Sequence, residues 1–207
     1  MQKGLLQAVV FDFGKVISLP PAEGIMAELA AIAGLPVATL DALAWKHRGE
    51  YDRGTVSGTE YYRGMLASVG VSVEDEALET IVRLDLNSWK GINPGTVRLM
   101  EDVKAAGYRL GVLSNMPHDF LAWARDSIPV FRLLDAGIFS CEVGSIKPEA
   151  AIYEALVAAL ACKPGDLVFF DDMQVNVDRA VHLGMHSFLW QNPENARMVL
   201  QQAGITV

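Results

Sequence analysis

The aspartate at position 12 is the residue of this sequence best placed to do chemistry. It directly follows an apolar run that ends in Val9-Val10-Phe11, and Gly14 comes two residues later. A short apolar run that stops at a charge and a glycine is typical of a buried parallel strand whose last residue meets solvent. Ligands bind at the carboxyl ends of strands in open α/β sheets. An aspartate there can act as a nucleophile, as a metal ligand or as both.

Other polar residues share this placement, each beside the end of an expected strand or the start of an expected helix: Ser114 and Asn115, Lys147 (before Pro148), and Asp171 and Asp172. Carboxylates gathered around one point repel each other and raise one another's pKa. A hard divalent cation such as Mg²⁺, which takes oxygen ligands, relieves that repulsion. A lysine and a hydroxyl beside the cation suit the oxygens of a bound phosphate. The set therefore indicates phosphoryl transfer with electrostatic stabilisation of the phosphate charge.

The spacing of apolar residues predicts the elements that would bring these side chains together. Residues 1–17 provide the first strand, and residues 20–88 show apolar residues three or four apart, which predicts helices. From residue 93 onward strands and helices alternate: helices over 94–106, after 114, after 147 and after 172, and strands over 108–113, 138–143, 167–170 and 187–190. This alternation predicts an α/β fold with a doubly wound parallel sheet, which is Rossmann-like. We expect a catalytic core of residues 1–17 and 90–207 and a helical cap domain of residues 18–89.

Composition narrows the classes of protein that this chain can belong to. It has 207 residues, of which 51% are apolar and 20% charged, so it can bury a sizeable core and is not disordered throughout. Its net charge of −8 argues against non-specific binding of nucleic acid, which needs lysine and arginine. The two cysteines have no metal-binding spacing and are expected to be reduced. The sequence shows neither a signal peptide nor a membrane span, so we expect a cytoplasmic monomer or homodimer.

Four segments of the chain resemble the motifs of the haloacid dehalogenase (HAD) superfamily of phosphotransferases. They occur in that family's order and with its spacing: VVFDFGKV from Val9, GVLSN from Gly111, GSIKPEAAIY from Gly144 and VFFDDMQVNV from Val168. The helical block also fits the cap that this family inserts after its first motif. The nearest resemblance is to the bacterial α-D-glucose-1-phosphate phosphatases, which also have an aspartate, an apolar residue and a glycine in the first motif.

The resemblance implies a role for each matching residue. Asp12 would be the nucleophile that forms an aspartyl-phosphate, and Lys147 would neutralise both the phosphate and the nucleophile. Ser114 and the backbone of Asn115 would bind the phosphoryl group. The metal ligands would be four residues, with Asn176 orienting them: Asp12, the carbonyl of Gly14, Asp171 and Asp172.

One position departs from the family's pattern. Most phosphatases of this family carry a second aspartate two residues after the nucleophile, where it serves as general acid and base, and here that position is Gly14. General acid–base catalysis is typically worth about 10²–10⁴-fold. Either the leaving group needs little protonation, or another group supplies the proton, or the enzyme is slow. His47 and Arg48 in the helical block and His118 after the Ser114 loop are the candidates, although charged residues on a helix usually form a solvated face.

The leading functional hypothesis is a Mg²⁺-dependent phosphatase that acts on a small phosphorylated metabolite, possibly a sugar 1-phosphate. A haloacid dehalogenase also uses an aspartate nucleophile, but dehalogenases of this superfamily lack the paired carboxylates found here at Asp171 and Asp172. The third hypothesis is a catalytically weak binding or regulatory protein on the same fold, and its support is Gly14 and Lys15. Each motif taken alone also has a structural explanation, such as a turn, a helix cap or a solvated lysine.

Overall fold

The computed structural model of the protein describes residues 6–207, so residues 1–5 of the predicted first-strand segment lie outside it. Its centre is a five-stranded parallel sheet in the order β3-β2-β1-β4-β5. The strands are β1 (Ala8–Phe11), β2 (Arg109–Ser114), β3 (Ala136–Phe139), β4 (Leu167–Asp171) and β5 (His186–Leu189). The chain adds strands first on one side of β1 and then on the other. Strand β1 is therefore the point where the strand order reverses, which is where open α/β sheets bind ligands.

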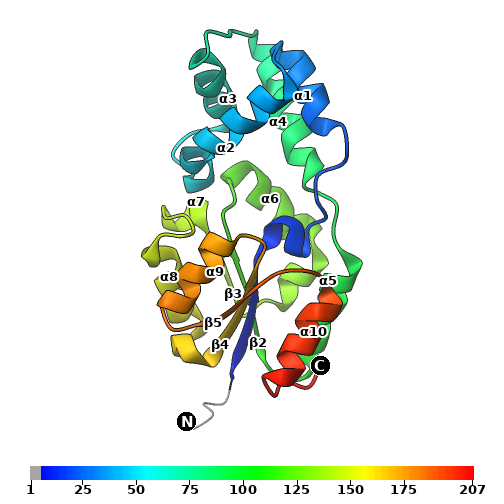
Figure 1. The fold of residues 1–207 in the computed structure, drawn as a ribbon, viewed down its shortest axis with the longest axis vertical. Coiled ribbons are helices and arrows are strands. Elements are labelled where there is room, and N and C mark those ends of the chain that lie inside the picture. Colours follow the sequence, from blue (N-terminus) through cyan, green and yellow to red (C-terminus); the bar gives the residue numbers. More distant parts are fainter. Residues whose placement is uncertain (1–5) are drawn as a thin grey trace.

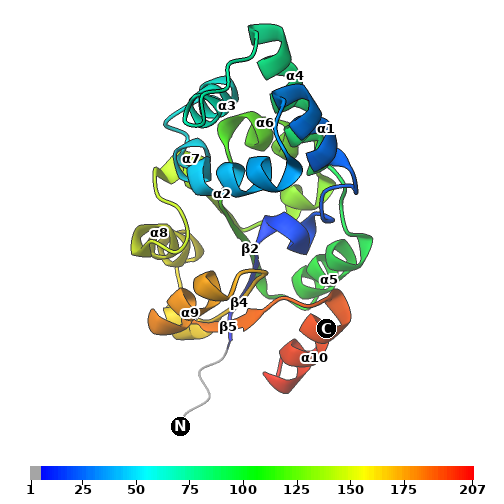
Figure 2. The ribbon, with the colours of Figure 1, turned by 45° about the horizontal axis from the view of Figure 1, so that its top comes forward.

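Helices cover both faces of this sheet, which confirms the predicted doubly wound α/β fold (Figures 1 and 2). Side chains alternate between the two faces along a strand, so Val9 and Phe11 pack on one side, while Ala8 and Val10 pack on the other. The first side is covered by α5 (Pro94–Ala105), α6 (His118–Ser127) and α10 (Pro193–Gln202). The second is covered by α8 (Ala150–Leu160) and α9 (Gln174–His182).

Four helices between β1 and β2 form a separate layer at one end of the molecule, which we call the helical insert (Figure 1). They are α1 (Ile25–Ala33), α2 (Val37–Arg53), α3 (Gly58–Ala67) and α4 (Asp75–Ser88). The insert has a hydrophobic cluster of its own, in which Leu40, Tyr51 and Ile81 are almost completely buried. The two chain segments that lead into and out of it are paired, because Ser18 and Ile92 form an antiparallel bridge.

Several predicted elements have different bounds in the structure. The first strand ends at Phe11, and Phe13–Ile17 do not extend it. They form a turn that the Ser18 N–H closes by donating to the Phe13 carbonyl at 2.8 Å, and the dihedrals of Gly14 and Lys15 within it are not helical. The helix predicted to open at Lys147-Pro148 begins only at Ala150, because residues 144–149 form a loop closed by bonds to the Glu149 carboxylate. The predicted strand over 138–143 is β3 followed by the short helix α7 (Ser140–Val143). Helix α6 follows Ser114, as predicted, whereas α10 was not predicted, and short 3₁₀ turns occupy 129–133 and 164–166.

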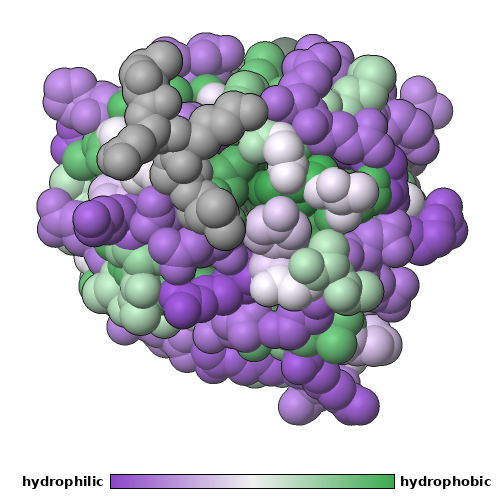
Figure 3. Space-filling model, turned by 90° about the horizontal axis from the view of Figure 1, so that it is seen from below, coloured by the Kyte–Doolittle hydropathy of each residue, from purple (hydrophilic) through white to green (hydrophobic). Residues whose placement is uncertain are grey.

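No single helix within residues 6–207 has the length and apolar composition needed to cross a membrane, although α1 and α2, bent at 93° to each other, meet both criteria as a pair. Figure 3 shows the end of the molecule away from the helical insert, where hydrophilic residues predominate and apolar ones lie between them.

Candidate active site

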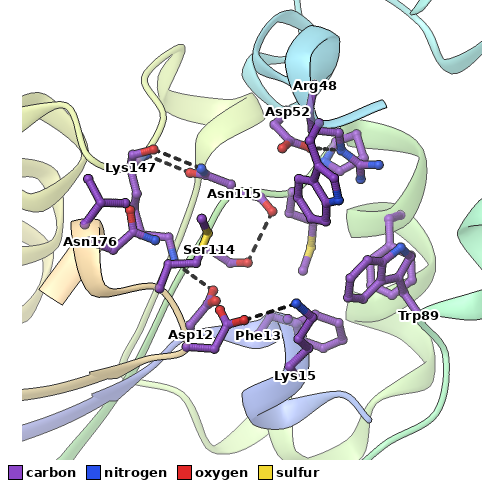
Figure 4. A pocket seen from close by; sticks show the side chains of 18 of the residues that line it. Asp12, Phe13, Lys15, Arg48, Asp52, Trp89, Ser114, Asn115, Lys147 and Asn176 are labelled. Carbon is purple, nitrogen blue, oxygen red and sulfur yellow. Dashed lines mark hydrogen bonds and ion pairs between the residues drawn. The ribbon is translucent and has the colours of Figure 1, made fainter. Parts of the chain in front are cut away.

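The ends of three neighbouring strands bring the predicted site residues to one point. Asp12 follows β1, Ser114 is the last residue of β2 and Asp171 is the last residue of β4. A cavity of about 530 Å³ lies between this edge of the sheet and the helical insert (Figure 4). On the sheet side its lining includes Asp12, Gly14, Ser114, Asn115, Lys147 and Asp172.

The ammonium of Lys147 lies at the centre of this cluster and has three bonding partners. Its Nζ is 2.7 Å from Oδ1 of Asp12 and 2.6 Å from Oδ2 of Asp171, and it donates to the carbonyl of Leu113 at 3.0 Å. The side chain is 2% exposed. Burial lowers the pKa of Lys147, but Asp12 and Asp171 together raise it above its usual value. The residue is therefore a fixed positive charge beside the Asp12 carboxylate.

The Asp12 carboxylate is buried in the wall of the cavity, from which a phosphate group would approach it. Its backbone N–H donates to the carbonyl of Phe170 at 2.9 Å, which fixes the residue at the end of β1. Burial raises the pKa of Asp12 to about 7, while the Lys147 ammonium acts to lower it. An ionised carboxylate in this position has a free oxygen for attack, because Lys147 contacts Oδ1 alone.

The two adjacent carboxylates after β4 have different surroundings. Oδ1 of Asp171 accepts bonds from the Met173 N–H at 2.8 Å and from Nδ2 of Asn176 at 2.9 Å, and Oδ2 faces Lys147. Asp172 instead lines the cavity, and its Oδ2 is 3.4 Å from Nζ of Lys15. Both carboxylate oxygens of Asp171 are thus bonded to neighbouring protein groups, whereas the Asp172 side chain faces the cavity in which a ligand would bind.

A divalent cation fits the donor set of this cluster. Carboxylate oxygens of Asp12, Asp171 and Asp172 lie within 4.8 Å of one another. Burial raises the pKa of Asp172, with Lys15 opposing and Asp171 reinforcing that change. Lys147 pairs with Asp12 and Asp171, and Lys15 pairs with Asp172, so three carboxylates face two ammonium groups. Ionised carboxylates in this cluster therefore leave negative charge uncompensated, and hard cations prefer such oxygen ligands.

Asn115 holds the backbone on both sides of Lys147. Its Oδ1 accepts from the Lys147 N–H at 2.7 Å, and its Nδ2 donates to the Lys147 carbonyl at 3.1 Å. The sequence predicted that the backbone of Asn115 binds phosphate, but it carried no sign of this side-chain contact. Ser114 is 2% exposed and lines the same cavity, so its hydroxyl and the Asn115 backbone lie beside the nucleophile.

The residues after the nucleophile turn sharply beneath the cavity. Lys15 has a left-handed φ of 57°, and its N–H donates to Oγ of Ser18 at 3.0 Å. Its ammonium lies 3.4 Å from Asp172 and 5.9 Å from the centre of the Trp45 ring. Lys15 therefore lies at the rim of the cavity, with its ammonium turned toward Asp172 (Figure 4), while its side chain stays 44% exposed.

The helical insert supplies the opposite wall of the cavity, with Trp45, Arg48, Asp52, Leu86 and Trp89. The guanidinium of Arg48 bonds to Asp52 at 2.8 Å and to Asp85 at 3.3 Å, and Nε1 of Trp89 donates to Asp85 at 3.3 Å. Of the residues that the sequence suggested here, Arg48 lines the cavity, whereas His47 and His118 are absent from its described lining. Neither histidine is therefore placed to protonate a leaving group at Asp12.

Comparisons with known proteins agree with this geometry. Residues 6–180 match the family described as haloacid dehalogenase-like hydrolase. The chain is 27% identical over 191 residues to phosphatase MT3486 of Mycobacterium tuberculosis (strain CDC 1551 / Oshkosh), covering 89% of this chain and 87% of that protein. It is 24% identical over 212 residues to flavin mononucleotide hydrolase 1 of Arabidopsis thaliana, covering 100% of this chain and 81% of that protein.

Solved structures share the fold at low sequence identity. The magnesium complex of HAD family enzyme bt-2542 from Bacteroides thetaiotaomicron superposes with a TM-score of 0.76, at 18% identity, over 96% of this chain and 100% of that chain. The L-2-haloacid dehalogenase RSc1362 superposes with a TM-score of 0.77, also at 18% identity, over 96% and 100% of the two chains. The same fold thus occurs in a dehalogenase, so it does not decide which bond is broken.

Proposed function

The chain belongs to the haloacid dehalogenase-like hydrolase family, and on that basis we propose that it is a Mg²⁺-dependent phosphatase of a small phosphorylated metabolite. The observation that carries this proposal is the contact of one buried lysine with two carboxylates, at 2.7 Å from Asp12 and 2.6 Å from Asp171, beside the cavity-facing Asp172. A relative that is 27% identical over most of its length is named as a phosphatase, which supports this choice.

In the proposed reaction Asp12 attacks the phosphorus atom of a phosphate monoester. The bond from Asp12 to phosphorus forms as the bond from phosphorus to the alcohol oxygen breaks, and the alcohol leaves as its anion, which takes a proton from solvent. Water then attacks the phosphorus of the aspartyl-phosphate and gives up a proton to solvent, which releases inorganic phosphate and restores the Asp12 carboxylate. The Lys147 ammonium and the Ser114 hydroxyl stabilise the charge on the phosphate oxygens in both steps.

Asp12 and Asp172 are the proposed carboxylate ligands of Mg²⁺, with the Gly14 carbonyl as a further ligand. Asp171 completes the acidic cluster, and its bonds to Asn176 and Lys147 fix these two side chains beside the proposed metal ligands. When bound, the cation neutralises charge on the phosphate oxygens and orients them. We further propose that the helical insert acts as the cap domain, residues 18–89, over a catalytic core of residues 1–17 and 90–207.

The leaving group is proposed to be a relatively acidic alcohol, because Gly14 provides no proton donor beside Asp12. The anomeric hydroxyl of a sugar is more acidic than its primary hydroxyls, so a sugar 1-phosphate fits better than a 6-phosphate. A cavity of about 530 Å³ falls within the range of about 300–1,000 Å³ that is usual for small-molecule sites, so it can hold a sugar phosphate. Trp45 and Trp89 offer aromatic faces for the apolar side of such a ring, and Arg48 and Asp52 offer polar atoms for its hydroxyls.

Hydrolysis of an aryl phosphate with and without Mg²⁺ tests the proposal. We expect turnover in Mg²⁺ and a fall to background in excess chelator, restored when Mg²⁺ is added back. Full activity in chelator would contradict the metal-dependent mechanism. The same assay with a 2-haloacid addresses the second hypothesis, in which the chain is a dehalogenase. Inactivity toward both substrates, together with binding of inorganic phosphate, would favour the third hypothesis of a catalytically weak binding protein.

A further inference from the structure

One residue of the helical insert holds both ends of the loop that carries Lys147. This loop, residues 144–149, is called the Lys147 loop below. Nη1 of Arg53, the last residue of α2, donates to the carbonyl of Gly144 at 3.1 Å and to Oε2 of Glu149 at 2.9 Å. Its Nη2 donates to Oε1 of Glu149 at 2.7 Å. The planar guanidinium therefore spans the first and the last residue of the loop, a geometry that a lysine could not reproduce.

Further bonds inside the Lys147 loop transmit this contact. Oε2 of Glu149 also accepts from Oγ of Ser145 at 2.8 Å and from the Ile146 N–H at 3.2 Å. At the middle of the loop the Asn115 side chain bonds to both backbone groups of Lys147. The loop is thus fixed from the core at Lys147 and from the insert at its two ends.

The same end of α2 is also linked, through Ser140, to the second of the proposed phosphate-binding segments. The hydroxyl of Ser140 donates to the backbone carbonyl of Asp52, one residue before Arg53, and accepts from the Met116 N–H at 2.9 Å. Met116 directly follows Ser114 and Asn115. The end of α2 therefore contacts the Lys147 loop directly and is linked to residues 114–116 through the Ser140 hydroxyl.

We propose that Arg53 is a positioning residue that couples the placement of the helical insert to the placement of the Lys147 ammonium, an inference that rests on the proposed phosphatase function. Small displacements of a charged group from its productive geometry cost large factors in rate. The Arg53 and Glu149 side chains are 24% and 44% exposed, so their ion pair contributes little to the stability of the fold. We expect the ion pair instead to reduce the mobility of the Lys147 loop and to increase the rate of turnover.

The test compares Arg53→Ala and Arg53→Lys with Arg125→Ala in the full chain. Arg125 forms an equally close two-bond pair with Glu142, at 2.6 and 2.8 Å, but both residues lie outside the insert and away from the cavity lining. Hydrogen exchange of residues 144–149 is measured beside kcat and KM for an aryl phosphate. We expect faster exchange in this loop and a fall of about five- to tenfold in kcat/KM for Arg53→Ala, carried mainly by kcat. Arg53→Lys should recover part of both losses, and Arg125→Ala should change neither.

Each other outcome overturns the inference. Unchanged exchange in the loop, or faster exchange with unchanged kcat/KM, would show that Arg53 does not position Lys147. If Arg125→Ala changed loop exchange and kcat/KM as much as Arg53→Ala does, Arg53 would have only a general stabilising role. If Arg53→Ala does not fold, Arg53→Gln is used under the same criteria. Inactivity of the unmodified protein would count against the proposed function instead, and hydrogen exchange, which needs no turnover, would then decide the inference alone.

Discussion

The indole ring of Trp89 lies against the backbone of Gly14, two residues after the proposed nucleophile. A Cβ atom on Gly14 would stand 3.7 Å from Cζ3 of Trp89 and 4.0 Å from Oδ2 of Asp12, which are ordinary contact distances. The φ of Gly14 is −62°, a value that any residue adopts. The backbone therefore has room for a Cβ atom here, so neither crowding at that atom nor the backbone dihedral requires a glycine.

The first prediction concerns the leaving group. Without a proton donor at Gly14, the departing oxygen carries most of its negative charge in the transition state. We expect kcat/KM across a series of phosphate monoesters to fall steeply as the pKa of the leaving alcohol rises. A shallow dependence in the unmodified protein would contradict the account, because it would mean that another group already donates the proton.

The matching variant is Gly14→Asp, with Gly14→Ala as the control that fills the same space without a carboxyl group. Gly14→Asp should flatten the dependence on the leaving group, with the largest gain for the most basic alcohols. A gain within the 10²–10⁴-fold range that general acid catalysis typically contributes is the upper expectation. Gly14→Ala should keep the steep dependence. Equal behaviour of the two variants would show that the carboxyl group does not act as an acid there.

The second prediction separates the two adjacent carboxylates after β4. Asp172→Asn should raise the Mg²⁺ concentration needed for half-maximal activity and leave the thermal unfolding temperature nearly unchanged, because Asp172 faces the cavity. Asp171→Asn removes a buried partner of Lys147 and Asn176, and should lower the free energy of unfolding by about 3 kcal/mol. Metal titrations and denaturant unfolding of both variants check this. Equal effects of the two substitutions on stability would contradict the assignment.

The third prediction addresses Lys147, whose ammonium would contact phosphate in the ground state and in the transition state. Lys147→Ala should raise KM and lower kcat together, with a fall in kcat of about 10²–10³-fold. The control is Lys163→Ala, at an exposed lysine beside the opposite end of β4. Steady-state kinetics in saturating Mg²⁺ provide the measurement. Activity at the unmodified level would mean that Lys147 serves the fold alone.

The fourth prediction is a titration of Glu149. The bonds from Arg53, and next those from Ser145, lower the pKa of Glu149 from its usual value to about 2. A carboxyl group with a lowered pKa in the folded state stabilises the fold above its unfolded pKa, and solvent screening keeps that contribution small for a pair as exposed as this one. That stabilisation is lost as the pH falls from about 4.5 toward 2. Carboxyl NMR should give a midpoint near 2, which should rise toward the usual value in Arg53→Ala. An unchanged midpoint would show that the pair does not form in solution.

The parts of the site that the sequence predicted are those in which a local pattern implies a position. An apolar run that ends at Asp12, and another that ends at Asp171, predict strand ends, and parallel strands bring such ends to one edge of a sheet. The start of helix α10, which was not predicted, could have been found by the same local pattern. Asn192-Pro193 is an N-cap residue followed by proline, like the pair Asn93-Pro94 that predicted the start of α5.

The contacts that the sequence did not predict join residues far apart in the chain. Arg53 and Glu149 are 96 positions apart, and Asn115 and Lys147 are 32 apart. No periodicity or turn pattern connects such positions, because their pairing depends on how the helical insert meets the sheet. The predicted start of the helix after Lys147 was wrong for the same reason. Hydrogen bonds to the Glu149 side chain hold residues 144–149 as a loop, and these tertiary contacts override the local preference of a proline for a helix start.

The central claim is that Asp12 carries the phosphoryl group during turnover, and acid quenching followed by mass spectrometry tests it most directly. The protein is mixed with Mg²⁺ and an excess of a fast aryl phosphate, quenched in acid, digested and analysed. We expect the added mass of one phosphoryl group on Asp12 in the unmodified protein, and neither that mass nor turnover in Asp12→Asn. Turnover by Asp12→Asn at the unmodified rate, or a phosphoryl group found on another residue, would contradict the claim.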